Sequence, residues 1–408
     1  MRLMAKVAFR NLLRNRKRSL LVIMAVAFGL GSVLFLRGFV SGVQKQMEEN
    51  ITSIITGEVS IFPKSMENLY DTNDSIQDAE KVRRILKGDP HILHFAEEVY
   101  GSGIAATANG SVMTFVVGLD PEEERMIGTH FPLVAGRVME GHEEGMALLG
   151  EKMRKMLGLE LGEKVVITVQ DTSGGLTGES FTLLGTLETG NDQLDSGNVI
   201  LLRRPAQRLL GLGERISKIV LKLDSKADPH DVVRNLRKQL VGTNLSVMSW
   251  EEQIPMLAQM MRFQDGMIFV ILMIVLLVAT AGILNTLLMS IIERTQEFGL
   301  MMALGTRPFQ LILLIALESL LLTALGVLLG VMLGLSAILY FGYVGIDLSW
   351  FVSALSNFFV GSHVYPQVDG FYLLLFSGIV LGSNGLASLY PAWKASRLVP
   401  IEAMRQVG

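Results

Sequence analysis

The chain has 408 residues, of which 50% are hydrophobic and only 18% are charged. This composition, with a mean hydropathy of +0.42, excludes an ordinary soluble enzyme and indicates an integral membrane protein. The net charge of −3 says little, because the charges are segregated along the chain. The absence of cysteine excludes disulfides and thiolate metal sites.

The N-terminal segment, residues 1–18, is basic, and its apolar residues recur at roughly helical spacing. This pattern predicts an amphipathic helix on an anionic membrane surface. A first transmembrane span is predicted at 19–42, which is too long for a removable signal peptide. Arg37 falls near the far end of this span, where its side chain can snorkel.

Residues 43–264 are less apolar, and their pattern predicts an extramembrane α+β domain that ends in a stalk. It shows no metal-ligand cluster, nucleophile motif or phosphate loop. A hairpin loop is predicted at 171–180. Strands are predicted at 59–62, 111–119, 146–150, 164–170, 181–187, 198–202, 218–223 and 245–250, and helices at 78–88, 151–159, 205–212 and 228–242.

A second helical pattern opens at Ser249, which forms a predicted capping box with Glu252. The pattern runs without a break into a second span at 266–292. A helix of some 40 residues would be about 60 Å long, roughly twice the thickness of the bilayer core. The alternative is a hinge at Gly266 that separates a stalk from the span.

Two further spans are predicted at 309–341 and 371–391, joined by a loop at 342–370 that contains a candidate interfacial helix at 348–360. Glycines recur at four-residue intervals in both spans, and small residues at that spacing let another helix approach closely. These glycines are Gly326, Gly330 and Gly334 in the third span, and Gly378 and Gly382 in the fourth.

Three of the polar residues inside predicted spans are candidates for a specific role. Glu318 is a functional candidate because an intramembrane carboxylate is costly, although a hydrogen-bonded packing role is favoured over proton coupling. Asn285 and Asn384 are interpreted as interhelical hydrogen-bonding residues. Together they do not form a recognisable catalytic set.

The basic residues predict the orientation of the chain. No Lys or Arg occurs between Pro308 and Trp393, whereas the N-terminal arm, residues 293–307 and the tail at 392–408 all carry them. By the positive-inside rule these three segments face the cytoplasm. Both termini are then cytoplasmic, and residues 43–264 lie outside.

The segment ERTQEFGLMMALGTRP, residues 293–308, lies between two spans. Its spacing predicts a short amphipathic helix, with Gly305 as C-cap and Pro308 in the first turn of the next helix. The alternative is a solvated turn between two helices.

This segment, the tail LYPAWKASRLVPIEAMR (389–405) and the basic RNLLRNRKRS (10–19) resemble the permease family that includes MacB, FtsX, LolC and LolE. GEKMRKMLGLELGEKVVITV (150–169) and VILLRRPAQRLLGLG (199–213) resemble the periplasmic core domain of that family. The resemblance implies four transmembrane helices plus a large extracytoplasmic α+β domain of the MacB periplasmic core type. It also implies location in the bacterial inner membrane.

The resemblance further implies that residues 293–307 form a coupling helix that docks on a separate P-loop ATPase, in two copies. ATP and Mg would be bound by that partner, and this chain would hold no cofactor, metal or catalytic residue. A second permease subunit, identical or paralogous, would pack on the glycine faces and the first two spans. The implied ATPase contact comprises Glu293, Arg294, Glu297, Phe298, Met301, Met302 and Arg307.

Length and layout are most similar to the LolC/LolE type, as is GEVSIFPK (57–64). MacB-type chains carry a fused ATPase domain, and FtsX-type chains have a smaller outer domain. The expected function is therefore ATP-driven extraction of lipoproteins from the inner membrane for outer-membrane sorting, by mechanotransmission. The alternatives are FtsX-like signalling to a periplasmic partner and export of another lipid or amphiphile. No nucleic-acid partner is implied.

Overall fold

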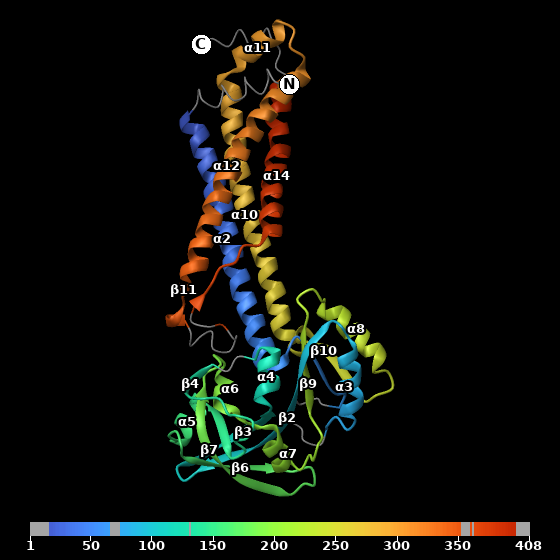
Figure 1. Cartoon of the computed structure of the whole chain (residues 1–408). Coiled ribbons are helices and arrows are strands. Elements are labelled where there is room, and N and C mark those ends of the chain that lie inside the picture. Colours follow the sequence, from blue (N-terminus) through green and yellow to red (C-terminus); the bar gives the residue numbers. More distant parts are fainter. Residues whose placement is uncertain (1–15, 66–73, 130–131, 352–359, 361–362, 397–408) are drawn as a thin grey trace. The chain divides into compact units, whose positions relative to one another are not determined.

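The structure, a computed structural model, describes residues 16–65, 74–129, 132–351, 360 and 363–396 (Figure 1). The chain divides into two compact units. The helical unit comprises 1–44, 261–347 and 363–408, and the sheet unit comprises 45–260 and 348–362. Three predicted segments lie mostly outside the described residues, namely the N-terminal helix, the candidate helix at 348–360 and the C-terminal tail.

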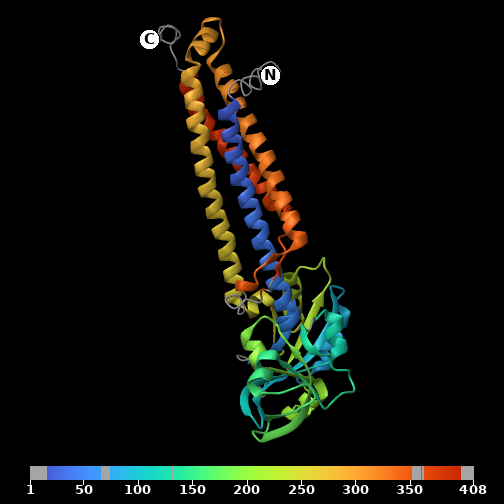
Figure 2. The same cartoon turned by 90° about the vertical axis from the view of Figure 1, so that its left-hand side faces the viewer.

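Within the described residues, four helices are long and apolar enough to cross a membrane (Figure 2). Each of the four predicted spans lies inside one of them. The helices extend beyond the predicted spans, because helical backbone hydrogen bonding does not stop where the apolar residues stop. The helices are α2 (Arg16–Ile51), α10 (Pro255–Glu293), α12 (Pro308–Val344) and α14 (Gly370–Ser396).

The α10 helix is unbroken over 39 residues and passes through Gly266, so the alternative of a hinge there was wrong. The break lies earlier, at Ile254, between the short helix α9 (Trp250–Gln253) and Pro255. The backbone amide of Ser249 donates to the Glu252 carboxylate at 3.3 Å, as the predicted capping box requires. At 1.5 Å per residue, α10 is about 60 Å long.

The predicted close approach at the third-span glycines is confirmed, and its partner is α2 of the same chain. A Cβ atom at Gly330 would lie 2.9 Å from the carbonyl oxygen of Ala27, and Gly326 and Gly334 are equally close to α2 side chains. This face is therefore filled inside the helical unit and is not available to a second subunit. Around Gly378 and Gly382, by contrast, no described atom beyond the adjacent backbone of α14 itself lies within 4 Å of the position that a Cβ would occupy, and both residues are exposed.

Over its described residues, the sheet unit contains ten strands in the order β10-β1-β9-β2-β3-β8-β5-β7-β4, with β6 paired to β2 and β7. The strands are β1 (Val59–Pro63), β2 (Ile92–Thr107), β3 (Gly110–Leu119), β4 (Leu133–Gly136), β5 (Met146–Gly150), β6 (Lys164–Gln170), β7 (Leu176–Leu187), β8 (Asn198–Leu202), β9 (Lys218–Leu223) and β10 (Leu245–Ser249).

Every predicted strand is confirmed in place, but the longest strand, β2, was missed together with β4. The predicted hairpin loop is shorter than expected, because β7 already begins at Leu176. The predicted helices correspond to α3 (Ala79–Gly88), α5 (Glu151–Leu157), α7 (Arg203–Leu210) and α8 (Pro229–Gln239), whereas α4 (Pro121–Ile127) and α6 (Asp192–Gly197) were not predicted.

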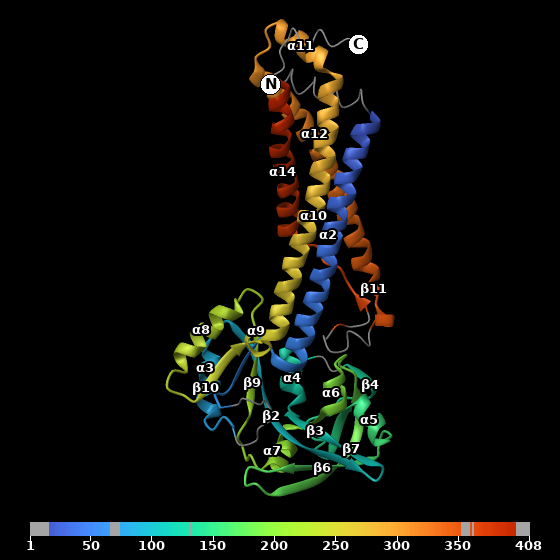
Figure 3. The same ribbon diagram turned by 180° about the vertical axis from the view of Figure 1, so that it is seen from behind.

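Strand β2 joins two parts of the sheet (Figure 3). Its first half, up to Glu98, pairs with β9, and its second half, from Val99, pairs with β3 and β6. Helices α3 and α8 lie with the first part, and α5, α6 and α7 with the second (Figure 3). One continuous apolar core nevertheless fills both parts, so the sheet unit folds as one body.

Candidate functional site

The candidate site is the bend that connects α10, α11 (Thr295–Ala303) and α12 at one end of the helical unit (Figure 1). The short helix predicted from the sequence is confirmed, and the solvated-turn alternative was wrong. Arg294 is the pivot, because its amide still bonds to α10 while its carbonyl accepts from Phe298. Gly305 follows α11 with φ at +98°, and Pro308 opens α12, both as predicted.

The Arg294 side chain ties this bend to α12. Its Nη1 donates to Glu318 Oε2 at 3.2 Å, and its Nε donates to Glu297 Oε2 at 3.1 Å. The guanidinium also lies 5.0 Å from the ring centroid of Phe298. Arg294 and Glu318 are both buried, so the charge of each is compensated by the other inside the protein.

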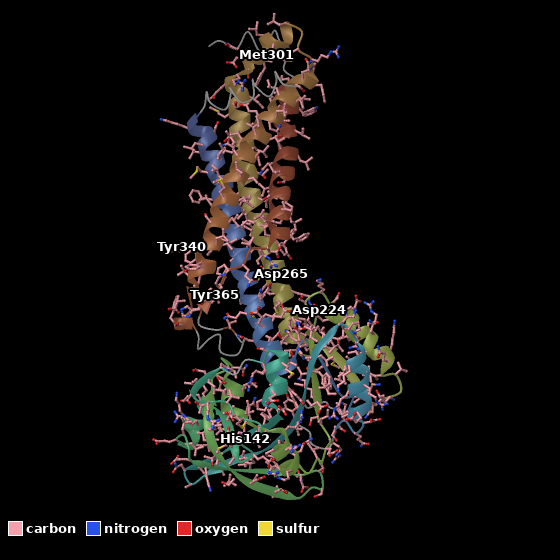
Figure 4. All side chains as sticks on the ribbon, viewed as in Figure 1. His142, Asp224, Asp265, Met301, Tyr340 and Tyr365 are labelled. Carbon is pink, nitrogen blue, oxygen red and sulfur yellow. The ribbon has the colours of Figure 1, made fainter. Side chains whose placement is uncertain are left out.

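Phe298 lies in the apolar core of the helical unit and is only 1% exposed. Met301, which is labelled in Figure 4, and Met302 are partly buried against the same core. The apolar face of α11 therefore packs on the chain's own helices. This differs from the expectation that Phe298 belongs to the contact with the ATPase.

The outward surface of the bend is formed by other residues. Leu300 and Leu304 are exposed, Leu304 by 79%, and Phe309 is exposed at the start of α12. Glu293 and Arg307, two of the predicted contact residues, lie exposed beside them. The bend thus presents an apolar surface with a charged margin, a composition suited to a protein partner. The sequence pattern could not show which apolar residues face inward.

The other predicted intramembrane polar residues behave differently from one another. Asn384 is fully buried on α14 and accepts a hydrogen bond of 2.9 Å from Thr280 on α10, so its interhelical role is confirmed. Glu318 is a packing residue, held by Arg294 as above. Asn285 is exposed on α10 and makes no hydrogen bond to another helix among the described residues, so its interhelical role stays a prediction.

A second charged cluster lies at the other end of the helical unit, near Asp265 in Figure 4. Arg37 on α2 is buried and ion-paired with Asp265 on α10, and it lies 3.9 Å from both Asp369 and the ring centroid of Tyr372. Gln44 donates to Asp265 at 3.2 Å. Arg37 therefore joins three helices instead of snorkelling.

The chemistry of these clusters is structural. In the described ranges, no group of three or more His, Asp or Glu side chains is placed to hold a metal ion. At the bend, the buried Arg294–Glu318 pair connects α12 to the junction of α10 and α11.

Comparison with known proteins gives the family. Residues 19–239 match the MacB-like periplasmic core domain, and residues 269–400 match the FtsX-like permease C-terminal domain. The lipoprotein-releasing system transmembrane protein LolC of Neisseria meningitidis serogroup B is 23% identical, over 96% of this chain and 97% of the relative. The macrolide export protein MacB of Campylobacter jejuni is 23% identical over 98% of this chain, which spans 60% of that relative.

Among solved structures, the periplasmic region of MacB from Actinobacillus actinomycetemcomitans matches 52% of this chain and 97% of that chain, with a TM-score of 0.37 and 18% identity. The first domain match alone covers more than half of the sequence. The chain therefore belongs to the ABC transporter permeases of the MacB/LolC family, as a membrane protein with a MacB-like extracytoplasmic domain and an FtsX-like permease domain.

Proposed function

We propose that this permease passes the motion of a separate P-loop ATPase, through the α10–α11–α12 bend, to its extracytoplasmic domain, and that the cargo is a lipoprotein of the bacterial inner membrane. The observation that carries the proposal is the Arg294–Glu318 pair. The pair makes the bend and α12 move together. If α11 moved away from Glu318, two buried charges would lose each other in an apolar surrounding, which is costly.

The α10 helix supplies the path for that motion. It runs unbroken from Pro255, in the sheet unit, to Glu293 at the bend. A helix with an intact backbone ladder resists bending, so a movement at one end displaces the other end rather than being absorbed at a hinge. In this proposal the bend and both termini lie in the cytoplasm, and the sheet unit lies in the periplasm.

The ATPase would dock on the exposed surface of the bend, formed by Leu300, Leu304 and Phe309 with Glu293 and Arg307 at its margin. Arg294 and Phe298 would act from beneath that surface by holding α11 in place. ATP and Mg would be bound by the ATPase, which would be present in two copies beside a second permease subunit. The exposed glycines of α14, Gly378 and Gly382, remain available for that subunit, as close-packing positions.

Lipoprotein cargo is proposed from the match to LolC, which extends over almost the full length of both chains. The name of that relative describes lipoprotein release. The proposed mechanism needs no pore, because the cargo would be lifted from the membrane by the extracytoplasmic domain.

The first experiment replaces Leu304 with Asp in the tagged chain and measures copurification of the ATPase from native membranes. A carboxylate at an exposed position leaves the fold intact, but it opposes burial in an interface. We expect the ATPase to be lost from the purified complex. Val241→Asp is the matched control, because Val241 is equally exposed, at 79%, and lies in the sheet unit. Retention of the ATPase by the Leu304 variant would contradict the docking surface.

The second experiment tests the cargo with a photocrosslinking amino acid at exposed positions of the sheet unit. Lipoprotein adducts that disappear when ATP is withheld support the proposal. Adducts with a soluble periplasmic enzyme would instead show a signalling role, and adducts with lipid alone would show another amphiphile as cargo.

A further inference from the structure

The sheet unit buries more acidic than basic groups at the joint of its two parts. Glu98, Glu124 and Lys218 are all buried, Lys218 completely. Glu98 lies on β2 directly opposite Lys218 on β9. This is the last β2–β9 pair before β2 begins to pair with β3. Glu124 comes from α4, which packs on β2 and β9 at this point (Figure 3).

The hydrogen bonds around the two carboxyl groups leave one oxygen without a donor. The Tyr100 hydroxyl donates to Glu98 Oε2, and the Thr129 hydroxyl donates to Glu124 Oε2, each at 2.6 Å. Glu124 Oε1 is buried and accepts no hydrogen bond from the described residues. Glu98 and Glu124 are both buried where α4 packs on β2, and their charges act on each other. Two neighbouring buried carboxyl groups can form a hydrogen bond only if one of them carries a proton.

The charges lead to the same conclusion. If both glutamates and the lysine were ionised, the buried set would carry a net charge of −1, which is costly away from water. One proton on the acid pair makes the set neutral. Glu123, on the same helix, adds further negative charge near Glu124, but it is itself paired with Arg203 at 2.6 Å.

We propose that Glu98 and Glu124 form a proton-binding site that closes the joint between the two parts of the sheet unit, and that loss of this proton releases α4. Glu124 carries the proton and donates a hydrogen bond to the Glu98 carboxylate. Glu98 also accepts a hydrogen bond from Tyr100 and faces Lys218. No catalytic role and no partner is needed, so the inference stands apart from the proposed function.

The electrostatic environment supports this assignment. Burial raises the pKa of Glu124 well above its ordinary value of 4.5, and the neighbouring Glu98 raises it further. Burial also raises the pKa of Glu98, against the opposing effect of Lys218. The pKa of Lys218 is lowered by burial, while both glutamates act to raise it.

The position of α4 gives proton loss a structural consequence. Ile127 of α4 packs with Ala96 of β2 and Val220 of β9. Ile127 and Gly128 also line a cavity of about 310 Å³ whose other wall includes Thr52, Ser53 and Gly57. These belong to the π-helix Thr52–Thr56 and the turn after it, where α2 passes into β1. Movement of α4 would therefore reach the point at which the membrane-spanning helix enters the domain.

The direction of the pH effect follows from the raised pKa of Glu124. In the closed joint Glu124 keeps its proton, whereas in an opened joint it titrates near its ordinary value. Opening therefore releases one proton, and its equilibrium constant rises about tenfold per pH unit, from above pH 4.5 until the pH passes the pKa of the closed state. The closed joint is favoured at low pH and is weakened as the pH rises.

The test is hydrogen exchange of the full-length protein in nanodiscs, followed on the peptide that contains α4 and corrected for intrinsic rates with an unstructured reference peptide. The amides of Gly128 and Thr129 bond within this turn and report its opening. We expect the opening constant to rise with pH in the wild type, and to be flat in Glu124→Gln, whose amide can donate to Glu98 without titrating. Glu122→Gln, at an exposed position on the same helix, is expected to behave like the wild type.

A second readout does not depend on any variant folding. Infrared spectroscopy of the wild-type protein should show a protonated carboxyl band that persists at pH values at which exposed carboxyl groups are ionised. Absence of this band would overturn the proposal, as would an α4 opening constant that does not rise with pH or that rises equally in Glu124→Gln. Helix α8, which lies in the same unit away from the acid pair, should show no such pH dependence and serves as the internal control.

Discussion

The two units of this permease bury charge in different ways. In the helical unit, Arg294 meets Glu318 and Glu297, and Arg37 meets Asp265 and Asp369, so each buried arginine is paired with two carboxylates. In the sheet unit, two buried glutamates face a single buried lysine. The first arrangement links neighbouring helices through buried ion pairs, which are called brackets below. The second is neutral only with a bound proton.

This difference assigns different tasks to the two kinds of cluster. An arginine stays protonated at any pH that a protein meets, so the helical brackets hold their helices together in all conditions. A carboxyl pair with a raised pKa instead loses its proton, and so changes its charge, as the pH rises through that pKa. In the two proposals, force transmission belongs to the helical unit and the response to pH belongs to the sheet unit.

The largest expected effect comes from Lys218→Met, which removes the buried cation that faces the acid pair. Breaking a buried ionic set in this way costs about 4 kcal/mol of unfolding free energy. The loss should be smaller in acid, where the glutamates take up a second proton. Chemical unfolding can be followed by the fluorescence of the buried Trp250, with Trp350 and Trp393 replaced by Phe.

Lys222→Met is the matched control for that variant, because Lys222 lies on the same strand and pairs with Glu58 while 42% of its side chain is exposed. An exposed pair contributes about 0.5 kcal/mol. Equal losses of unfolding free energy in the two lysine variants would show that the buried set contributes no more than an exposed ion pair, and would contradict the contrast between the two units.

A somewhat smaller effect is expected for Glu318→Ala. Arg294 loses its buried partner but keeps the half-exposed Glu297, so we expect a loss of about 3 kcal/mol in a detergent unfolding titration, with little pH dependence around neutrality. Glu297→Ala should cost less than about 1 kcal/mol, by the scale of exposed pairs. A strong pH dependence near neutrality in the wild-type helical unit would contradict the contrast between the two units.

The smallest effect in this series tests packing rather than charge. Gly330→Val places new atoms against the backbone of α2 and should cost about 2 kcal/mol of the stability of the helical unit. Gly378→Val, on an open face of α14, should leave the unfolding of the single chain unchanged. Measured in the same detergent titration, equal effects would show that α2 and α12 do not pack closely at these glycines.

Much of the fold could be predicted because its signals are local. Long apolar runs define α2, α10, α12 and α14, and regular alternation of apolar residues defines strands such as β6, whose inward residues are Val165, Ile167 and Val169. Strand β2 could not be found in this way, because Glu97 and Glu98 interrupt its apolar pattern. Both are buried, and their partners Arg83, Arg203 and Lys218 come from distant parts of the sequence.

The candidate site shows the same limit. The pattern of residues 293–308 correctly predicted a short helix with a glycine stop. It could not show whether Phe298 faces a partner or the chain's own core, since both produce the same spacing. The partners of Gly330 and Arg37 also depend on which helices meet, and helical periodicity alone does not contain that information.

The central claim is that the Arg294–Glu318 bracket carries ATP-driven motion into α10 and on to the sheet unit. The most direct measurement is the distance between spin labels at two exposed positions, Val241 and Tyr343, one in each unit, in a chain that has no native cysteine. We expect the distance distribution of the assembled complex to change between the nucleotide-free and vanadate-trapped states. In Glu318→Gln that change should disappear while ATP hydrolysis continues. A change of the same size in Glu318→Gln would contradict the account.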